Sequence, residues 1–259
     1  MNPENENLPR QFQKILKFAD SLLKQRGGGI APETDILDFG SGGGKLVRWL
    51  LSEGYSACGV DFYEGKDAFK EMLETGHFKP VQGDPYIIPH EDESFDLVIS
   101  QNVFEHVLDF DAVVSEIARV TRSGGYGVHL FPPGTALIEG HINVPLAGCI
   151  QRYWWIKLWS PFARWMDARG AGESGGAISA EGDIALRKFT WIKEHTNYLP
   201  HGVIRQKFGE HFSEVNFLDT ELFMFWPGRL RKFAPLVRAL PFIGKLNRRF
   251  RVVAILVQK

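Results

Sequence analysis

The sequence predicts an α/β protein built on a mainly parallel sheet that is doubly wound, with helices on both faces. Three observations carry this prediction. Short apolar runs alternate with helical patterns between residues 35 and 131, the first run ends in a glycine-rich turn, and polar residues follow the runs. Strands joined by helical crossovers form parallel sheets covered on both faces. Because ligands of such sheets bind beyond the carboxyl ends of the strands, those polar residues are the first candidates for a site.

The first strand and its turn read I-L-D-F-G-S-G-G-G over residues 36–44, and K-L-V-R-W-L-L with helical spacing follows. Glycines such as Gly40, Gly42 and Gly44 permit positive φ and let a ligand approach the backbone. The start of the next helix offers free N–H groups and the positive end of the helix dipole. This arrangement suits a nucleotide-like ligand that carries a carboxylate or a phosphate.

Two common glycine motifs fail on spacing. A phosphate-binding loop, G-x-x-x-x-G-K-[ST], would place its first glycine at Phe39 and its hydroxyl at Leu46. A dinucleotide fingerprint, G-x-G-x-x-G, would place its third glycine at Lys45. The spacing that fits is D-x-G-x-G-x-G, which begins at Asp38.

Three further motifs follow in order along the chain. G-V-D-F-Y-E ends an apolar run in Asp61, where a carboxylate can accept ribose hydroxyls, although an acidic helix cap has the same appearance. V-Q-G-D-P-Y contains Asp84 in a turn. S-F-D-L-V-I-S-Q-N-V-F-E-H-V indicates a buried strand with Glu105 and His106 just beyond its end. A helix is then expected to end at Gly124, before a fifth strand.

Together these motifs resemble those of the class I S-adenosylmethionine-dependent methyltransferases of the small-molecule type, in detail over residues 30–131. The resemblance implies a seven-stranded sheet, an antiparallel C-terminal strand pair whose last strand lies between neighbours, and a helical cap after the fifth strand. It also implies S-adenosyl-L-methionine as the cofactor. The residues expected to bind this cofactor are Asp38, Gly40, Ser41, Gly42, Gly44, Asp61, Phe62, Gly83, Asp84, Pro85, Gln101 and Asn102.

The domain organisation follows from the same patterns. We expect a single domain over residues 1–259, with an amphipathic N-terminal helix at 10–26, a cofactor-binding core at 30–131, a cap insertion at 132–196 and a C-terminal part of the core at 197–259. Within the last part, a helix is expected at 197–212, strands at 214–222 and 252–257, and a basic insertion at 226–251.

The cap segment is rich in aromatic residues, since four of the seven tryptophans lie between Trp154 and Trp165. They can line an acceptor site or form the core of a small helical subdomain, and both interpretations stay open. An aromatic lining would favour an acceptor with a large apolar or ring component.

Histidine is the side chain best suited to act as a base near neutral pH. His141, beside Glu139 in the sequence, is the first candidate for a catalytic base, and His106 is the second. A structural role is the simpler alternative for each, and the Glu105–His106 pair can instead orient the cofactor loop. No Asp, Asn and His cluster resembles the metal site of catechol-type methyltransferases, so no metal is expected.

Composition and charge indicate the cellular compartment and the surfaces that the protein can contact. The two cysteines, Cys58 and Cys149, exclude a disulfide framework and favour a reducing compartment, so we expect a cytoplasmic protein. The net charge is −1, yet residues 226–259 hold nine basic and no acidic residues, which leaves 21 basic and 31 acidic residues elsewhere. A basic, apolar segment at 226–251 can lie on the inner face of an anionic membrane, or it can be a solvated lid. No specific nucleic-acid module is recognisable.

The sequence therefore predicts a methyltransferase that acts on a small or lipid-linked metabolite, more readily at oxygen than at nitrogen or carbon. Residues 101–104 read Q-N-V-F instead of the N-P-P-Y-like signature of enzymes that methylate ring amino groups. A non-catalytic S-adenosylmethionine-binding regulator or partner subunit is one alternative. An NAD-dependent oxidoreductase is another, disfavoured by Lys45.

Overall fold

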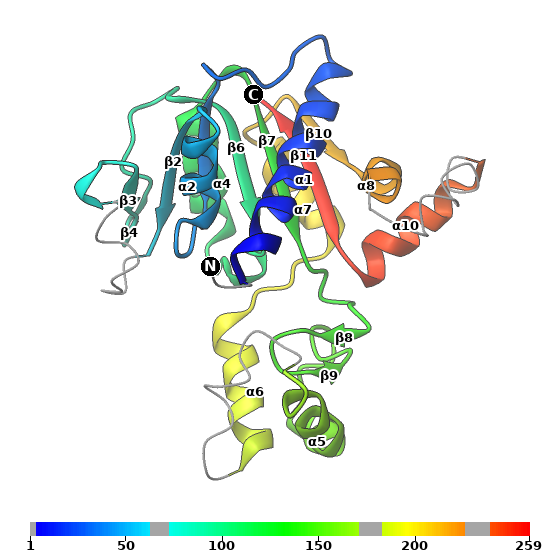
Figure 1. The fold of residues 1–259 in the computed structure, drawn as a ribbon. Coiled ribbons are helices and arrows are strands. Elements are labelled where there is room, and N and C mark those ends of the chain that lie inside the picture. The colour runs from blue at the N-terminus through cyan, green and yellow to red at the C-terminus, as the bar shows by residue number, and fades with distance from the viewer. Residues whose placement is uncertain (1–3, 63–72, 171–182, 226–238) are drawn as a thin grey trace.

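The structure, a computed structural model, describes residues 4–62, 73–170, 183–225 and 239–259. Seven strands form one sheet in the order β10-β11-β7-β6-β1-β2-β3 (Figure 1). The parallel strands are β1 (Asp35–Phe39), β2 (Ser56–Asp61), β3 (Phe78–Pro80), β6 (Phe95–Gln101) and β7 (Thr121–Phe131). Strand β11 (Val253–Gln258) lies between β7 and β10 (Glu214–Phe217) and is antiparallel to both. The predicted fold class is confirmed.

Helices cover both faces of this sheet. One face packs against α1 (Glu4–Lys24), α2 (Lys45–Ser52) and α8 (Asp219–Phe225) in a core that includes Leu22 and Leu50. The other face packs against α4 (Phe110–Val120), α7 (His201–Gly209) and the short 3₁₀ helix η1 (Phe104–His106), in a core that includes Ile117 and Phe208. Side chains along each strand contribute alternately to the two cores, because successive residues of a strand point to opposite faces of the sheet.

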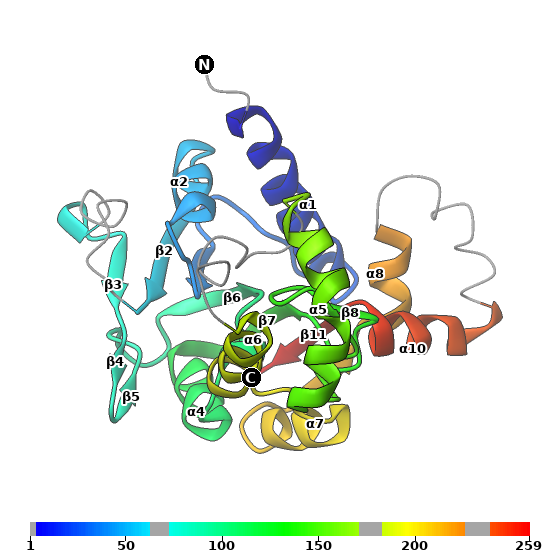
Figure 2. The ribbon, with the colours of Figure 1, turned by 90° about the horizontal axis from the view of Figure 1, so that it is seen from below.

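A cap extends from the carboxyl ends of the parallel strands (Figures 1 and 2). It consists of the hairpin β8 (Ile138–Glu139) and β9 (Val144–Pro145) with helices α5 (Tyr153–Asp167) and α6 (Ile184–His195). It has an apolar core of its own, which includes Ile156 and Ile192. The cap also buries a cation, Lys188. Its Nζ donates to the Ile142 carbonyl at 2.7 Å and to Asp167 at 2.8 Å, which links α6 to the hairpin and to α5.

Four boundaries differ from those predicted. Helix α1 begins at Glu4 and ends at Lys24, and α7 is shorter than the segment 197–212. Strand β7 already begins at Thr121, before the two glycines, because the Thr121 hydroxyl bonds the Ile117 carbonyl and closes α4 there. Residues 219–222 form α8 instead of a strand, since Leu218 and Leu222, four residues apart, both reach the core. Of the basic insertion 226–251, residues 226–238 lie outside the described residues, and α10 (Pro241–Phe250) follows.

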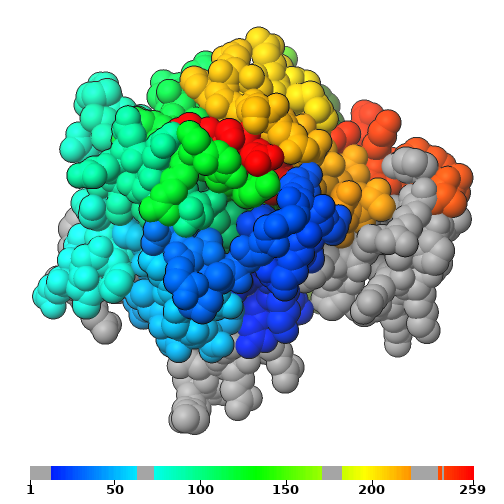
Figure 3. Space-filling view, turned by 90° about the horizontal axis from the view of Figure 1, so that it is seen from above, coloured from blue at the N-terminus to red at the C-terminus, as the bar shows by residue number. Residues whose placement is uncertain are grey.

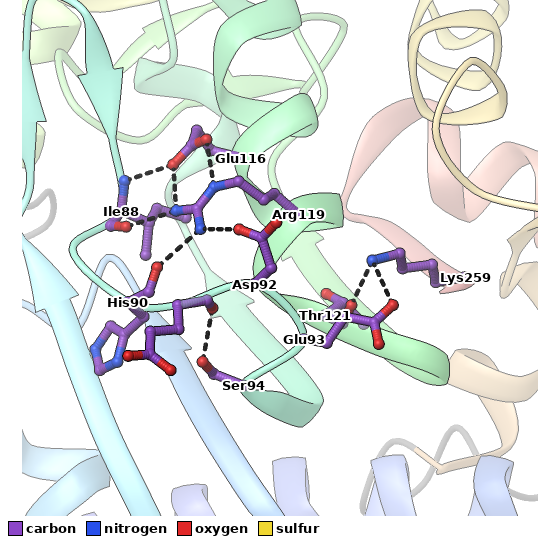
Figure 4. Close-up of polar contacts among 10 residues, drawn as sticks. Ile88, His90, Asp92, Glu93, Ser94, Glu116, Arg119, Thr121 and Lys259 are labelled. Atoms are coloured by element: carbon purple, nitrogen blue, oxygen red, sulfur yellow. Dashed lines mark hydrogen bonds and ion pairs between the residues drawn. The ribbon is translucent and has the colours of Figure 1, made fainter.

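Figure 4 shows how the segment before β6 is held against α4. The Arg119 guanidinium donates to the carbonyls of Ile88 and His90, both at 2.8 Å, and to Glu116 and Asp92. Glu116 in turn accepts the Ile88 N–H at 2.8 Å. These contacts fix the segment between β6 and the hairpin of β4 (Gln82–Gly83) and β5 (Tyr86–Ile87).

The opposite edge of the sheet carries the amino ends of the parallel strands. Figure 3 views this edge and shows the C-terminal residues (red) flanked by green residues of β7 and by the yellow to orange segment that leads to β10. Lys259 Nζ donates to the Thr121 carbonyl at 2.8 Å, which fastens β11 to the start of β7.

Candidate active site

The glycine turn between β1 and α2 adopts the predicted left-handed conformation. The φ angles are 76° at Gly40, 50° at Gly42 and 67° at Gly44. A Cβ atom on Gly40 would lie 2.2 Å from Cγ2 of Val103, whereas one on Gly42 would meet no atom within 4 Å. The turn therefore packs tightly against the segment after β6 at one glycine and leaves open space at the other.

Asp61 at the end of β2 fixes this turn. Its Oδ2 accepts the Gly42 N–H at 2.7 Å, and its Oδ1 accepts the Phe62 N–H at 2.7 Å. The Val60 carbonyl accepts the N–H groups of Gly40 and Ser41 at 2.9 and 3.1 Å. The second strand and the glycine turn thus form one rigid corner with a carboxylate at its edge.

A cavity of about 750 Å³ opens beside this corner, at the carboxyl ends of β1, β2 and β6. Such a volume lies within the usual range for a cofactor or substrate site. Eight of the twelve residues predicted to bind the cofactor line it: Gly40, Gly42, Asp61, Phe62, Gly83, Asp84, Pro85 and Asn102. Asn102 has a φ of 55°, a strained conformation of the kind that is concentrated at functional sites.

The other four predicted residues are not part of the cavity wall. Ser41 is buried behind the turn against Gly59, Gly44 caps α2, and Gln101 pairs with Leu130 inside the sheet. Asp38 is buried within β1, and burial, reinforced by the nearby charge of Asp61, raises its pKa to about 7. These residues support the corner from behind.

Sequence reasoning missed part of the wall. Tyr86 contributes an edge-on ring contact to Phe62, with ring centroids 6.1 Å apart. Apolar residues that follow β6 line the opposite side, and Leu108 is 65% exposed there. The E-H-V step marked this segment of the chain, but the segment's apolar residues carry no distinctive motif. The cavity wall also includes Val103, Val107, Leu108, Asp109, Ala112 and Val113.

The two predicted bases lie close together where the cap meets the core. Their ring centroids are 4.8 Å apart, but only His106 belongs to the cavity wall. His141, 7% exposed, hydrogen bonds through Nδ1 to Oε1 of Glu139 at 2.5 Å. Although burial opposes ionisation of Glu139, hydrogen bonds from His141, Tyr198 and the Ile142 N–H hold its pKa below the usual value.

Two groups of side chains have structural roles in the described residues. His129 on β7 is fully buried, and burial alone lowers its pKa to about 3, so this ring is neutral in the core. The tryptophans of α5 line neither large cavity; Trp155 and Trp159 pack against the cap core, and Trp154 is 61% exposed. Within the described residues, the tryptophan cluster therefore supports the cap's own structure.

A second cavity, of about 710 Å³, lies between the cap and the core. Its wall carries Arg152 and Lys193 from the cap, with Arg249 from α10. His201, whose pKa is lowered by burial and by the neighbouring Arg248 and Arg249, also borders it. This cavity is suited to a ligand with negative charge.

The fold and the corner of glycines and Asp61 define the class of protein: a nucleotide-type cofactor binder of the seven-stranded α/β type. Residues 37–128 match the family described as "Methyltransferase domain". The comparisons thus confirm the predicted resemblance to the S-adenosylmethionine-dependent methyltransferases and the cofactor that it implies, and the family match covers the core alone.

Curated relatives agree with this assignment. The chain is 34% identical over 99 residues to a demethylmenaquinone methyltransferase of Mycobacterium marinum, covering 37% of this chain and 40% of that protein. It is 33% identical over 96 residues to a ubiquinone biosynthesis O-methyltransferase of Thiobacillus denitrificans, covering 35% and 41%. The match thus spans less than half the length of either relative.

A solved structure shares the fold. The S-adenosylmethionine-dependent methyltransferase of Mesorhizobium loti superposes with a TM-score of 0.50 at 16% identity, over 89% of this chain and 94% of that one. Separately, none of the helices in the described part of the chain is both long and apolar enough to span a bilayer.

Proposed function

We propose that this protein methylates a small or lipid-linked metabolite, at oxygen, with S-adenosyl-L-methionine as the methyl donor. The cavity carries the proposal, because it combines an open left-handed glycine turn with Asp61 and Asp84 on its wall. When bound, the cofactor supplies a methyl group on a positively charged sulfur. The protein's part is to hold donor and acceptor in line and to exclude water.

The residues of the cavity fit such a cofactor. The space at Gly42, where a Cβ would meet nothing within 4 Å, admits a ligand against the backbone. Each oxygen of Asp61 accepts one N–H group. A carboxylate oxygen can accept a second hydrogen bond, so Asp61 is placed to accept the hydroxyl groups of a ligand. Phe62 and Tyr86 offer ring faces and edges for a flat heterocycle beside Asp84.

His106 is the better placed of the two predicted bases, because it lines the cavity while His141 lies behind it. This reverses the order expected from the sequence. Nδ1 of His106 hydrogen bonds to the His195 carbonyl at 2.7 Å, so Nδ1 carries the proton and Nε2 of the neutral ring has a lone pair. That lone pair can accept the proton of an acceptor hydroxyl.

The acceptor is proposed from two sources of support. Two relatives carry names that refer to demethylmenaquinone and to ubiquinone biosynthesis, which suggests a ring of the quinone or phenol type. The second cavity adds a cationic wall, which favours an acceptor with an acidic group. Incubating the protein with methyl-labelled cofactor and a panel of phenols, quinone precursors and amines, each with and without an acidic group, tests this choice.

The same experiment separates the rival functions. Product from a phenolic acceptor supports transfer to oxygen, and product from amines alone contradicts it. Tight cofactor binding without product across the panel favours a non-catalytic regulator. Calorimetric binding of NAD in preference to S-adenosylmethionine would favour an oxidoreductase.

Asp61→Ala should weaken cofactor binding by about 1–3 kcal/mol, because it removes hydrogen bonds to a charged group. Calorimetric titration with S-adenosylmethionine measures the change. Asp61→Asn keeps one acceptor oxygen for the Gly42 N–H, so it separates the loss of charge from loosening of the turn. Glu91→Ala, which removes an exposed carboxylate elsewhere, is the matched control. Unchanged affinity in Asp61→Ala would refute the assignment of this residue to the ribose.

Contact with an anionic membrane is proposed through α10. Phe242 and Leu246 are 60% and 53% exposed, and Lys245 and Arg249 are exposed on the same helix at three- and four-residue spacing. An exposed stripe that is both apolar and basic suits the interface of an anionic bilayer.

Replacing Phe242 and Leu246 together by serine should reduce binding to phosphatidylglycerol vesicles by about tenfold or more, since each side chain can bury apolar area worth about 1.5–3 kcal/mol. Co-sedimentation with vesicles measures this. Leu158→Ser removes a leucine of the cap that is 64% exposed and should leave binding unchanged. Equal sedimentation of the double variant and the unmodified protein would end the membrane proposal.

A further inference from the structure

Glu105, His106 and His141 converge at the junction of the cap and the core. Each offers one ligand atom, and these three atoms all lie within 4.8 Å of one another. Glu105 and His106 come from η1, directly after β6, whereas His141 comes from the hairpin of the cap. We propose that the three side chains form a binding site for a divalent transition-metal ion.

The two imidazoles are held in the orientation that a metal site requires. His141 Nδ1 bonds the Glu139 carboxylate at 2.5 Å, and His106 Nδ1 bonds the His195 carbonyl at 2.7 Å. Both partners are acceptors, so each Nδ1 carries a hydrogen, and in the neutral ring each Nε2 offers a lone pair to an ion. Metal-binding histidines almost always donate their second N–H to a carboxylate or a backbone carbonyl in this way.

The partners of these histidines are themselves fixed. Tyr198 donates to Glu139 Oε1 at 2.8 Å, and the Ile142 N–H donates to Oε2 at 2.9 Å. The Asn197 N–H donates to the Glu105 carbonyl at 2.7 Å, which ties η1 to the segment that leads from the cap to α7. Trp191 packs beside both rings, with centroids 5.0 Å from His141 and 6.2 Å from His106.

The chemistry of the set selects the class of ion. Two imidazoles and one carboxylate are ligands preferred by Zn²⁺, Fe²⁺, Mn²⁺ and Co²⁺ over Mg²⁺ or Ca²⁺. Glu105 is 1% exposed, and a carboxylate at such depth is accommodated best beside a cation. Its Oε1 lies 3.9 Å from Nε2 of His106, a separation that a shared ion can bridge.

The position of the proposed metal site fits a role in activating the methyl acceptor. Three protein ligands leave coordination positions open, as in catalytic metal centres. Because His106 also belongs to the wall of the cofactor cavity, the proposed site adjoins that cavity. A metal ion at this point would polarise an acceptor oxygen and lower its pKa. In a metal-bound protein, His106 and His141 would serve as ligands, and the acceptor hydroxyl, acidified by the ion, would lose its proton to water instead of to an imidazole.

Zn²⁺ titration of the full chain, after removal of metals with a chelator, tests the site by calorimetry. Visible absorption of the Co²⁺-loaded protein reports the coordination independently. The expected result is one ion per chain. Glu105→Gln and His141→Gln should each weaken binding more than tenfold, and Glu139→Gln, which loosens His141, should weaken it by about 10- to 100-fold.

Two controls keep the result specific. His195→Gln removes a nearby imidazole but leaves the carbonyl that bonds His106, so it should bind Zn²⁺ normally. Cys58→Ser tests for zinc held at the Cys58–His90 pair, whose Sγ and Nε2 atoms are 3.5 Å apart. Circular dichroism verifies folding of each variant; if Glu105→Gln does not fold, His141→Gln decides.

Binding of much less than one ion per chain, or undiminished binding by His141→Gln, overturns the proposal. Cofactor titration in the presence of the chelator is scored separately. The metal site can therefore fail while the proposed methyltransferase function stands, and the reverse also holds.

Discussion

Gly40→Ala is expected to abolish measurable cofactor binding. Alanine at a φ of 76° costs about 1–2 kcal/mol of backbone strain. Its Cβ would also lie 2.2 Å from Cγ2 of Val103, and relieving such an overlap costs about 1–3 kcal/mol more. The turn can escape only by moving away from the segment after β6, which displaces Gly42 and its bond to Asp61. Calorimetric titration with S-adenosylmethionine and urea denaturation measure the two losses.

Gly54→Ala separates strain from overlap. Gly54 has a φ of 86°, but a Cβ there meets no atom within 4 Å, so this variant should lose stability while it still binds the cofactor. Val103→Ala in the Gly40→Ala background should restore part of the affinity, because it removes the two atoms that the new Cβ strikes. Normal cofactor affinity in Gly40→Ala would show that the turn is not part of the binding site.

Asp38→Asn is expected to stabilise the cofactor-free protein above neutral pH. Burial, with the charge of Asp61 beside it, raises the pKa of Asp38 from 3.8 to about 7. Well below pH 3.8 the carboxyl is protonated in both the folded and the unfolded chain and has no effect on stability. Between pH 4 and 7 the unfolded chain ionises first, so folding carries a growing penalty, which levels off above pH 7. Three pKa units correspond to about 4 kcal/mol at most.

The free energy of unfolding of the two proteins, measured by urea denaturation from pH 4 to 8.5, tests this expectation. The advantage of Asp38→Asn should be smallest at pH 4, rise toward pH 7 and then stay constant. Glu53→Gln removes an exposed carboxylate and serves as the control for net charge. A constant difference across the whole range would mean that Asp38 ionises normally in the folded protein.

Much of the cofactor corner could be predicted from the sequence because it is local. The turn between β1 and α2, and Asp61 at the end of β2, belong to consecutive βα units, whose geometry places strand ends at one edge. The prediction that Asp38 and Ser41 line the site rests on their place within the motif. Spacing along a strand does not reveal which side chains the corner itself covers, and both are buried.

The junction at His106 and His141 could not be predicted in this way. Thirty-five residues separate the two histidines in the chain, and their approach depends on how the cap folds back on η1. That docking rests on Asn197, whose side chain donates to the Val107 and Leu108 carbonyls at 3.0 and 3.2 Å. Such contacts leave no periodic signal, so the sequence indicates the neighbouring pair Glu105 and His106 but not their approach to His141.

The placement of β11 has a consequence for how the chain acquires its structure. Strand β7 is the last parallel strand on one side of the sheet, and its outer neighbour there is β11. In the chain, β11 is synthesised only after the cap, α7, β10, α8 and α10. Until then β7, which includes Val128 and Leu130, presents an open edge that is a template for pairing with other chains. During synthesis, the parallel strands that hold the glycine corner can therefore fold before the C-terminal part of the chain. The open edge of β7 is protected against pairing with other chains only once β11 has been added.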